Sequence, residues 1–101
     1  MGWRRITSRE RDEARYELRR VGGATTLTVV RHDGQVDEYR ADELVLVRRV
    51  RDLELDLDSW HFFFRSGRSV VSPGLGGRNL ARRLRRAAPA ARHDVHHPDA
   101  D

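Results

Sequence analysis

The chain has 101 residues, of which 38% are hydrophobic and 36% are charged, and it contains no cysteine. This length suits one domain with a small core, and the lack of cysteine excludes disulfide bonds and thiolate metal sites. No apolar run reaches the roughly 18–20 residues that a membrane-spanning helix needs, and the N-terminus lacks the apolar stretch of a signal peptide. We therefore expect a cytoplasmic protein without a transmembrane segment.

Charge is distributed unevenly along the chain, which has a formal net charge of +4. Residues 75–92 contain six Arg and no acidic residue, whereas residues 32–58 contain nine acidic residues and four Arg. Every basic residue is Arg, which indicates a genome rich in G and C; selection for the bidentate guanidinium fork is the alternative. The chain is therefore a charge dipole rather than a uniformly basic protein.

Residues 8–20 admit two interpretations. Thr7 and Glu10 form a capping-box pair, which is typical of a helix start. Apolar and charged residues alternate along 14–19, which is typical of a strand instead. The glycine pair at 22–23 predicts a two-residue hairpin turn, and this turn favours the strand.

The next fifty residues predict a series of short strands. Asp33-Gly34 and Ser66-Gly67 are hairpin-turn signals because glycine tolerates a positive φ. The run 44–50 is apolar at successive positions and is typical of a strand buried on both faces. Including the N-terminal strand, we expect about seven strands, of which the later six cover 25–31, 35–40, 44–50, 53–58, 60–65 and 69–72.

The apolar period then changes from that of a strand to that of a helix. One narrow stripe recurs at helical spacing: Leu80, Leu84, Ala87 and Ala88. We expect the helix to start near Gly76 or Gly77 and to end at Pro89. Leu75 is out of phase with the stripe, so we predict that it packs on Leu80 from outside the helix as a hydrophobic staple. The opposite arc of the helix carries Arg78, Arg82, Arg83, Arg85 and Arg86.

The predicted fold class is α+β: an antiparallel β-meander or split barrel of about seven short strands, closed by one C-terminal amphipathic helix. We expect a polar N-terminal segment at 1–12, a single β-rich domain at 13–89 and a disordered tail at 90–101. The element order, the aromatic strand 60–64 and the closing leucines resemble the pleckstrin-homology-like superfold over residues 13–88. That resemblance implies phosphoinositide or peptide binding in many members, but the turn at 22–23 is too short to hold a lipid headgroup.

Two groups of potential metal ligands are not expected to bind a metal. The acids at 54, 56 and 58 alternate along a predicted strand about 7 Å apart, and no calcium-binding loop encloses them. We expect them to pair across strands with Arg48, Arg49 or Arg51. The second group lies in the tail, which we do not expect to supply a fixed second shell: His93, His96 and His97. The sequence therefore predicts no metal and no cofactor.

No catalytic residue is predicted either. His61 alternates with aromatic residues, and a general base would need an orienting carboxylate and a positioned nucleophile beside it. The serines at 59, 66, 69 and 72 lie in no nucleophile-elbow setting. The glycine-rich turn at 73–77 lacks the Lys-Ser/Thr of a Walker loop and the glycine spacing of a dinucleotide site, so we interpret it as a chain reversal.

The Arg face of the helix is the predicted binding surface. We expect a non-catalytic interaction or adaptor module that contacts an acidic protein partner or a larger assembly through these five Arg. Nucleic-acid binding through phosphates is the alternative, and a small phosphodiesterase or ribonuclease-like enzyme is the third hypothesis. A further possibility is that the acidic region 32–58 pairs with the Arg face, within one molecule or in a homodimer. Phe63 points away from the other aromatics, so we expect the helix or a partner to cover it.

Overall fold

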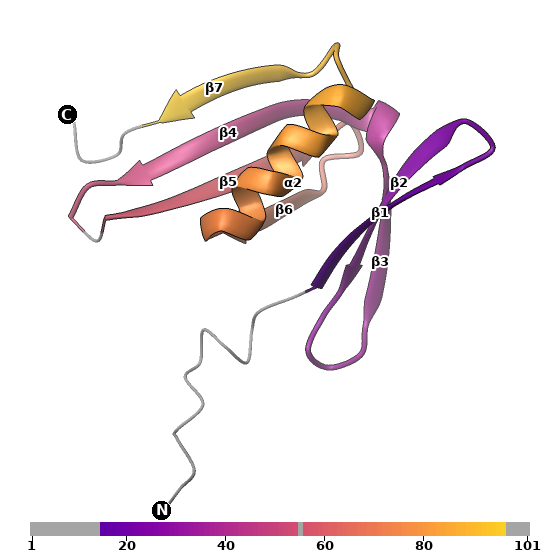
Figure 1. Cartoon of the computed structure of the whole chain (residues 1–101), viewed down its shortest axis with the longest axis horizontal. Helices are drawn as coiled ribbons and strands as arrows, with labels where there is room; N and C mark the ends of the chain where they lie inside the picture. Colours follow the sequence, from indigo (N-terminus) through magenta and orange to yellow (C-terminus); the bar gives the residue numbers. More distant parts are fainter. Residues whose placement is uncertain (1–14, 55, 97–101) are drawn as a thin grey trace, which may run out of the picture.

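The computed structural model describes residues 15–54 and 56–96. A three-stranded sheet contains, in spatial order, β1 (Arg15–Val21), β2 (Ala24–Val30) and β3 (Val36–Arg40). A four-stranded sheet in the order β6-β5-β4-β7 is formed by β4 (Leu44–Asp52), β5 (Leu57–Phe64), β6 (Ser69–Pro73) and β7 (Arg92–His96). The short 3-10 helix η1 (Ala41–Glu43) joins the sheets, and α2 (Gly74–Ala87) lies across one face of the larger sheet (Figure 1).

The α+β class and the single helix near the C-terminus are confirmed for the part of the chain that the structure describes. All neighbouring strands pair antiparallel except β4 and β7. The two sheets do not close into a barrel. The described residues form seven strands, as predicted, but the expected strand 53–58 is absent and β7 was not expected.

The first hairpin forms as predicted. Gly22 and Gly23 have φ of 58° and 83°, and Val21 pairs directly with Ala24. Residues 15–21 are therefore a strand, whereas residues 8–14 lie outside the described residues. The second turn is wider than the pair Asp33-Gly34, because the last paired residues are Val30 and Val36, and Gly34 alone in this turn has a positive φ. Its N–H donates to the carbonyl of Arg31 at 3.0 Å.

The predicted strand 53–58 is wrong. β4 continues to Asp52, residues 53, 54 and 56 lie in a turn, and β5 begins at Leu57. The alternation of leucine and acid imitates a half-buried strand, but Leu53 is 54% exposed. Asp56 adopts a left-handed φ of 51°, which reverses the chain in the middle of the alternating pattern.

The prediction of a disordered tail is wrong for β7, while residues 97–101, including His97, lie outside the described residues. β7 pairs in parallel with β4, and parallel strands need a crossover connection that is usually a helix. Because β4 and β6 are both antiparallel to β5, β7 runs in the same direction as β6, and α2 is the crossover between them. Arg48 of β4 adds a bidentate contact to Asp94, at 2.9 and 3.0 Å. Because these contacts are long-range, the local composition of the tail does not predict the strand.

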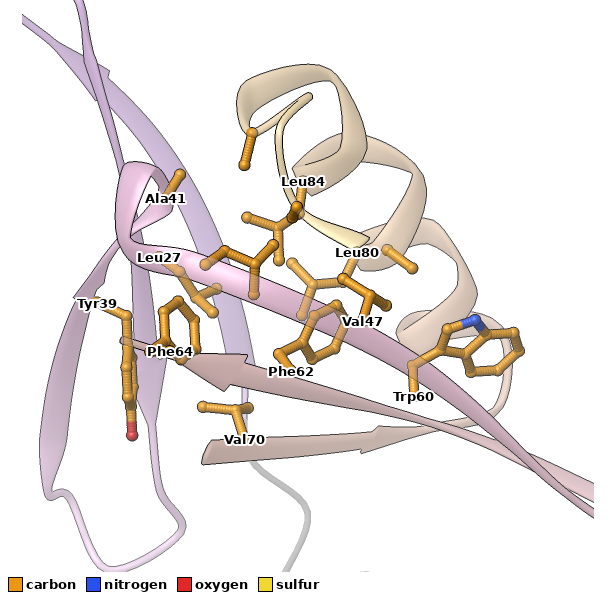
Figure 2. Packing of buried hydrophobic residues seen from close by; sticks show 14 of the residues in the cluster. Leu27, Tyr39, Ala41, Val47, Trp60, Phe62, Phe64, Val70, Leu80 and Leu84 are labelled. Carbon is orange, nitrogen blue, oxygen red and sulfur yellow. The ribbon is translucent and has the colours of Figure 1, made fainter. Parts of the chain in front are cut away.

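The predicted apolar stripe of α2 packs inward. Leu80, Leu84 and Ala88 are buried, and Ala87 is half-buried. Figure 2 shows Leu80 and Leu84 of α2 facing Val47 and Phe62 of the sheet. The staple prediction is wrong, because α2 begins at Gly74 and places Leu75 in its first turn, where 74% of Leu75 is exposed.

Aromatic contacts join the two sheets into one core. Tyr39 of β3 stacks on Phe64 of β5 with ring centroids 4.7 Å apart, and the guanidinium of Arg68 lies 4.1 Å from the Tyr39 ring. Tyr16 of β1 also donates its hydroxyl to the carbonyl of Val71 at 2.8 Å. The core cluster consequently contains residues of both sheets and of α2.

The face of the larger sheet opposite α2 is less covered than predicted. A register shift between Leu44 and Leu46 leaves Val45 40% exposed, so the run 44–50 is not buried on both faces. The helix does not cover Phe63, which is half-buried with Arg48 6.0 Å from its ring centroid and the His61 ring 6.4 Å away.

Two adjacent glycines in α2 give opposite expectations for stability. A Cβ at Gly77 would lie 2.0 Å from the carbonyl oxygen of Ser72, whereas a Cβ at Gly76 would meet nothing within 4 Å. We expect Gly77→Ala to lower the free energy of unfolding by about 1–3 kcal/mol or more. Gly76→Ala, the matched control, should raise it by up to about 1 kcal/mol because alanine favours a helix. Urea unfolding measures both, and equal effects would contradict the close approach at Gly77.

Candidate Arg-rich binding surface

The structure places the five predicted binding residues on the outer side of α2. Arg78, Arg82, Arg83, Arg85 and Arg86 are all exposed. The reason is the inward packing of Leu80 and Leu84, which fixes the rotation of the helix. Within residues 15–54 and 56–96, none of these five Arg side chains forms a hydrogen bond or an ion pair, so their guanidinium groups remain open to a ligand.

A cavity of about 300 Å³ lies between α2, β4 and β7, and we call it the β7-side cavity. Arg78, Arg82 and Arg85 line it from α2, and Arg49 lines it from β4. β7 adds His93, Asp94 and Val95, and the apolar part of the lining is completed by Val47, Trp60 and Ala81. The cavity therefore gathers four guanidinium groups from two elements around a partly apolar wall.

A second cavity, the β1-side cavity, lies on the other flank of α2 and also measures about 300 Å³. Arg83 and Arg86 contribute to it from the helix, and Arg19 and Arg20 contribute from β1. The Arg residues of α2 therefore line two basic cavities, one on each flank of the helix. Each cavity is also lined by Arg from a strand that is distant from α2 in sequence.

The acidic residues in the described part of the chain pair with strand and loop Arg rather than with α2. Asp37 contacts Arg31 and Arg68, and Asp42 contacts Arg40. Asp58 accepts hydrogen bonds from Arg49 at 2.7 Å and Arg51 at 3.2 Å, which confirms the predicted pairing across β4 and β5. Among the described residues, the acidic region 32–58 therefore does not neutralise the Arg face.

Arg49 is held in place more firmly than the helix Arg residues. Asp58 accepts a hydrogen bond from its Nη2, and its guanidinium lies 5.6 Å from the centroid of the Trp60 ring. Its Nε is buried and has no hydrogen-bond partner among the described residues. A buried charged donor without an acceptor destabilises the fold.

His61 of β5 and His93 of β7 lie on opposite faces of the larger sheet. His93 lines the β7-side cavity, where burial and then the positive charge of Arg85 lower its pKa. His61 lies on the other face and contacts the Ser59 hydroxyl at 3.3 Å. Burial and the charge of Arg48 lower the pKa of His61, and no carboxylate orients its ring among the described residues. Neither cavity is lined by His61, so it does not gain the acid and Arg neighbours that a catalytic role would need.

Comparison with protein-family models, curated proteins and solved structures finds no match for the chain. None of these comparisons supports the pleckstrin-homology-like resemblance, and β7 after the helix departs from the element order on which it was based. No helix in the described ranges has the length and apolar character needed to cross a membrane.

The cavities contain residues that sequence reasoning missed: Arg19, Arg20, Arg49 and His93. The sequence predicts that Arg19, Arg20 and Arg49 lie in strands and that His93 lies in the tail. The one available signal was the alternation that gives Arg49 the same strand face as Val47. Nothing in the sequence indicates that this face meets the flank of α2.

The Asp58 pair gives a pH-dependent expectation. The hydrogen bond from Arg49 is the main cause that lowers the pKa of Asp58. A carboxyl group with a lowered folded-state pKa adds stability above its unfolded pKa of about 3.9 and loses it as pH falls through the folded pKa. We expect Asp58→Asn to lower the free energy of unfolding by about 1 kcal/mol at pH 7 and to weaken the acid-dependent loss below about pH 4.

Chemical denaturation at a series of pH values measures both effects. Asp56→Asn is the matched control, because the Asp56 side chain is 89% exposed and its one contact, to Arg51, is long at 3.5 Å. Asn also tolerates the left-handed φ at this position, so the control should change stability little. Equal losses in the two variants would contradict a special role for the Arg49–Asp58 pair.

Proposed function

We propose that the protein is a non-catalytic interaction module that binds an acidic segment of a partner protein across the Arg face of α2. The observation that carries this proposal is the set of five exposed guanidinium groups without a partner among the described residues. Arg19, Arg20 and Arg49 extend the positive surface on both flanks of the helix. Such a field attracts and orients a negatively charged partner.

The spacing of the helix Arg residues supports a binding role over a purely structural one. Arg78 and Arg82, and likewise Arg82 and Arg86, are four residues apart on an exposed helix surface. Like charges at this spacing destabilise a helix by roughly 0.2–0.5 kcal/mol per pair. The favourable interaction with the negative C-terminal end of the helix benefits Arg85 and Arg86 but not Arg78. An anionic partner relieves this repulsion.

Binding to the phosphate backbone of a nucleic acid is the second candidate. The observation in its favour is that every cation of the surface is Arg, whose planar fork matches phosphate oxygens. Stacking on bases has less support, because Trp60, Phe62 and Phe64 are buried and Phe63 lies on the far side of the sheet. The candidate is therefore backbone binding without base recognition.

The main test replaces Arg82, Arg83, Arg85 and Arg86 together by Ser. We expect affinity for a short fluorescent peptide rich in Glu and Asp to fall about fourfold or more, because four exposed ion pairs at roughly 0.2–1 kcal/mol each contribute about 1–4 kcal/mol together. Fluorescence anisotropy at low salt measures the affinity, and circular dichroism verifies that the variant stays folded. Unchanged binding by the folded variant would refute the proposed function.

A single-charge comparison separates the helix from the overall charge of the protein. Arg65 is exposed in the turn between β5 and β6, and its side chain has no partner among the described residues. Arg65→Ser and Arg82→Ser remove the same charge, but only the second removes it from α2. The peptide affinity should respond more strongly to Arg82→Ser than to Arg65→Ser.

Salt dependence tests the nucleic-acid candidate separately. If four or five phosphates are contacted, the logarithm of affinity for a single strand should fall with the logarithm of salt concentration at a slope of about −3. Titrations of a fluorescent single-stranded oligonucleotide at several salt concentrations provide this slope. Absence of binding at low salt, beside tight binding of the acidic peptide, would remove nucleic acid from consideration.

A further inference from the structure

The two hollows beside α2 differ in how their cations are held. In the β1-side cavity all four Arg are exposed, and its lining contains no histidine and no acid. The β7-side cavity has one Arg fixed on a strand, three on the helix and an imidazole on β7. Only the second therefore places nitrogen donors on three different elements around one hollow.

The positive charge of the β7-side cavity is not cancelled by its own lining. Asp94 is its one acidic residue, and both oxygens of that carboxylate are occupied by Arg48. Asp58 occupies Nη2 of Arg49, whereas Nη1 of Arg49 has no hydrogen-bond partner among the described residues. The helix Arg residues that line the cavity have no partner among the described residues. The hollow thus contains a surplus of donors and of positive charge.

We infer that the β7-side cavity binds a phosphomonoester group, which is held between Arg49 on β4, the helix Arg residues and His93 on β7. This inference rests on the proposed function and specifies one anionic group of the partner. A phosphomonoester carries about two negative charges and three strong acceptor oxygens. These oxygens match donors that approach from three elements. A carboxylate has one charge and is satisfied by a single Arg fork, so it would leave the other guanidinium groups of the cavity unpaired.

Asp58 prepares the cavity for this ligand. Asp58 orients Arg49 over the Trp60 ring, so that one cation is in place before the ligand arrives. Burial and then the positive charge of Arg85 lower the pKa of His93, and a bound dianion would oppose the effect of Arg85. A charged guanidinium stacked on an indole also retains its donors for a phosphate.

Phenyl phosphate is the probe for the test, with benzoate as the control anion. A Trp3→Phe background leaves Trp60, which lines the cavity, as the single tryptophan, and its fluorescence reports binding. Arg82→Gln removes a charge from the β7-side flank of α2, and Arg83→Gln removes the same charge from the β1-side flank. We expect saturable binding of phenyl phosphate that Arg82→Gln weakens by about fivefold or more and Arg83→Gln by at most about twofold.

Arg85→Gln, a second variant of the β7-side flank, should behave like Arg82→Gln and protects the test against a local distortion. If phenyl phosphate shows no saturable binding, or if Arg82→Gln and Arg83→Gln weaken it equally, the proposed phosphomonoester site in the β7-side cavity is refuted. In that case the acidic-peptide experiment decides the proposed function independently. A phosphoserine peptide and a nucleoside monophosphate carry the same group, and the tighter of the two identifies its source.

Discussion

The packing of α2 on the aromatic face of β5 is the interaction on which the rest of the structure depends. Leu84 and Phe62 are fully buried, and both belong to the core that also contains Leu27 of the smaller sheet. At the N-terminal end of the helix, Gly77 approaches the main chain of Ser72 so closely that no Cβ fits. The narrow apolar stripe allows one rotation of the helix, and this rotation turns every helix Arg outward.

The arginines of β4 and those of α2 consequently have different environments. Those on β4, namely Arg48, Arg49 and Arg51, each contact a carboxylate of a neighbouring strand or turn. Those on α2 contact none within the described residues. Within region 32–58, Asp58 contacts this β4 group, while Asp37 and Asp42 contact other strand and loop Arg, so the charge dipole of the sequence is not cancelled inside the described fold. This division is what makes the helix surface a binding candidate.

Local patterns predicted the elements that are stabilised locally. The turn at Gly22 and the stripe of Leu80 and Leu84 carry their signals within a few residues, and both form. The strand β7 carries no such signal, because its sequence is polar except for Val95 and its pairing partner lies far away on β4. The alternation around Leu53 failed for the opposite reason: a local strand period persisted through a chain reversal. The sequence was enough to predict that the five helix Arg residues share one exposed surface. That Arg49 and His93 line the β7-side cavity beside them is seen only in the tertiary fold.

The crossover topology links the stability of β7 to any ligand of the β7-side cavity. β7 is an edge strand held by main-chain pairing to β4 and by the Arg48–Asp94 contact, and little of it is buried. A ligand that contacts both α2 and β7 binds only those molecules in which β7 is docked, so its apparent affinity scales with the docked fraction. By the same linkage the ligand stabilises the docked strand. Binding and the order of the last described strand are therefore two measures of one equilibrium.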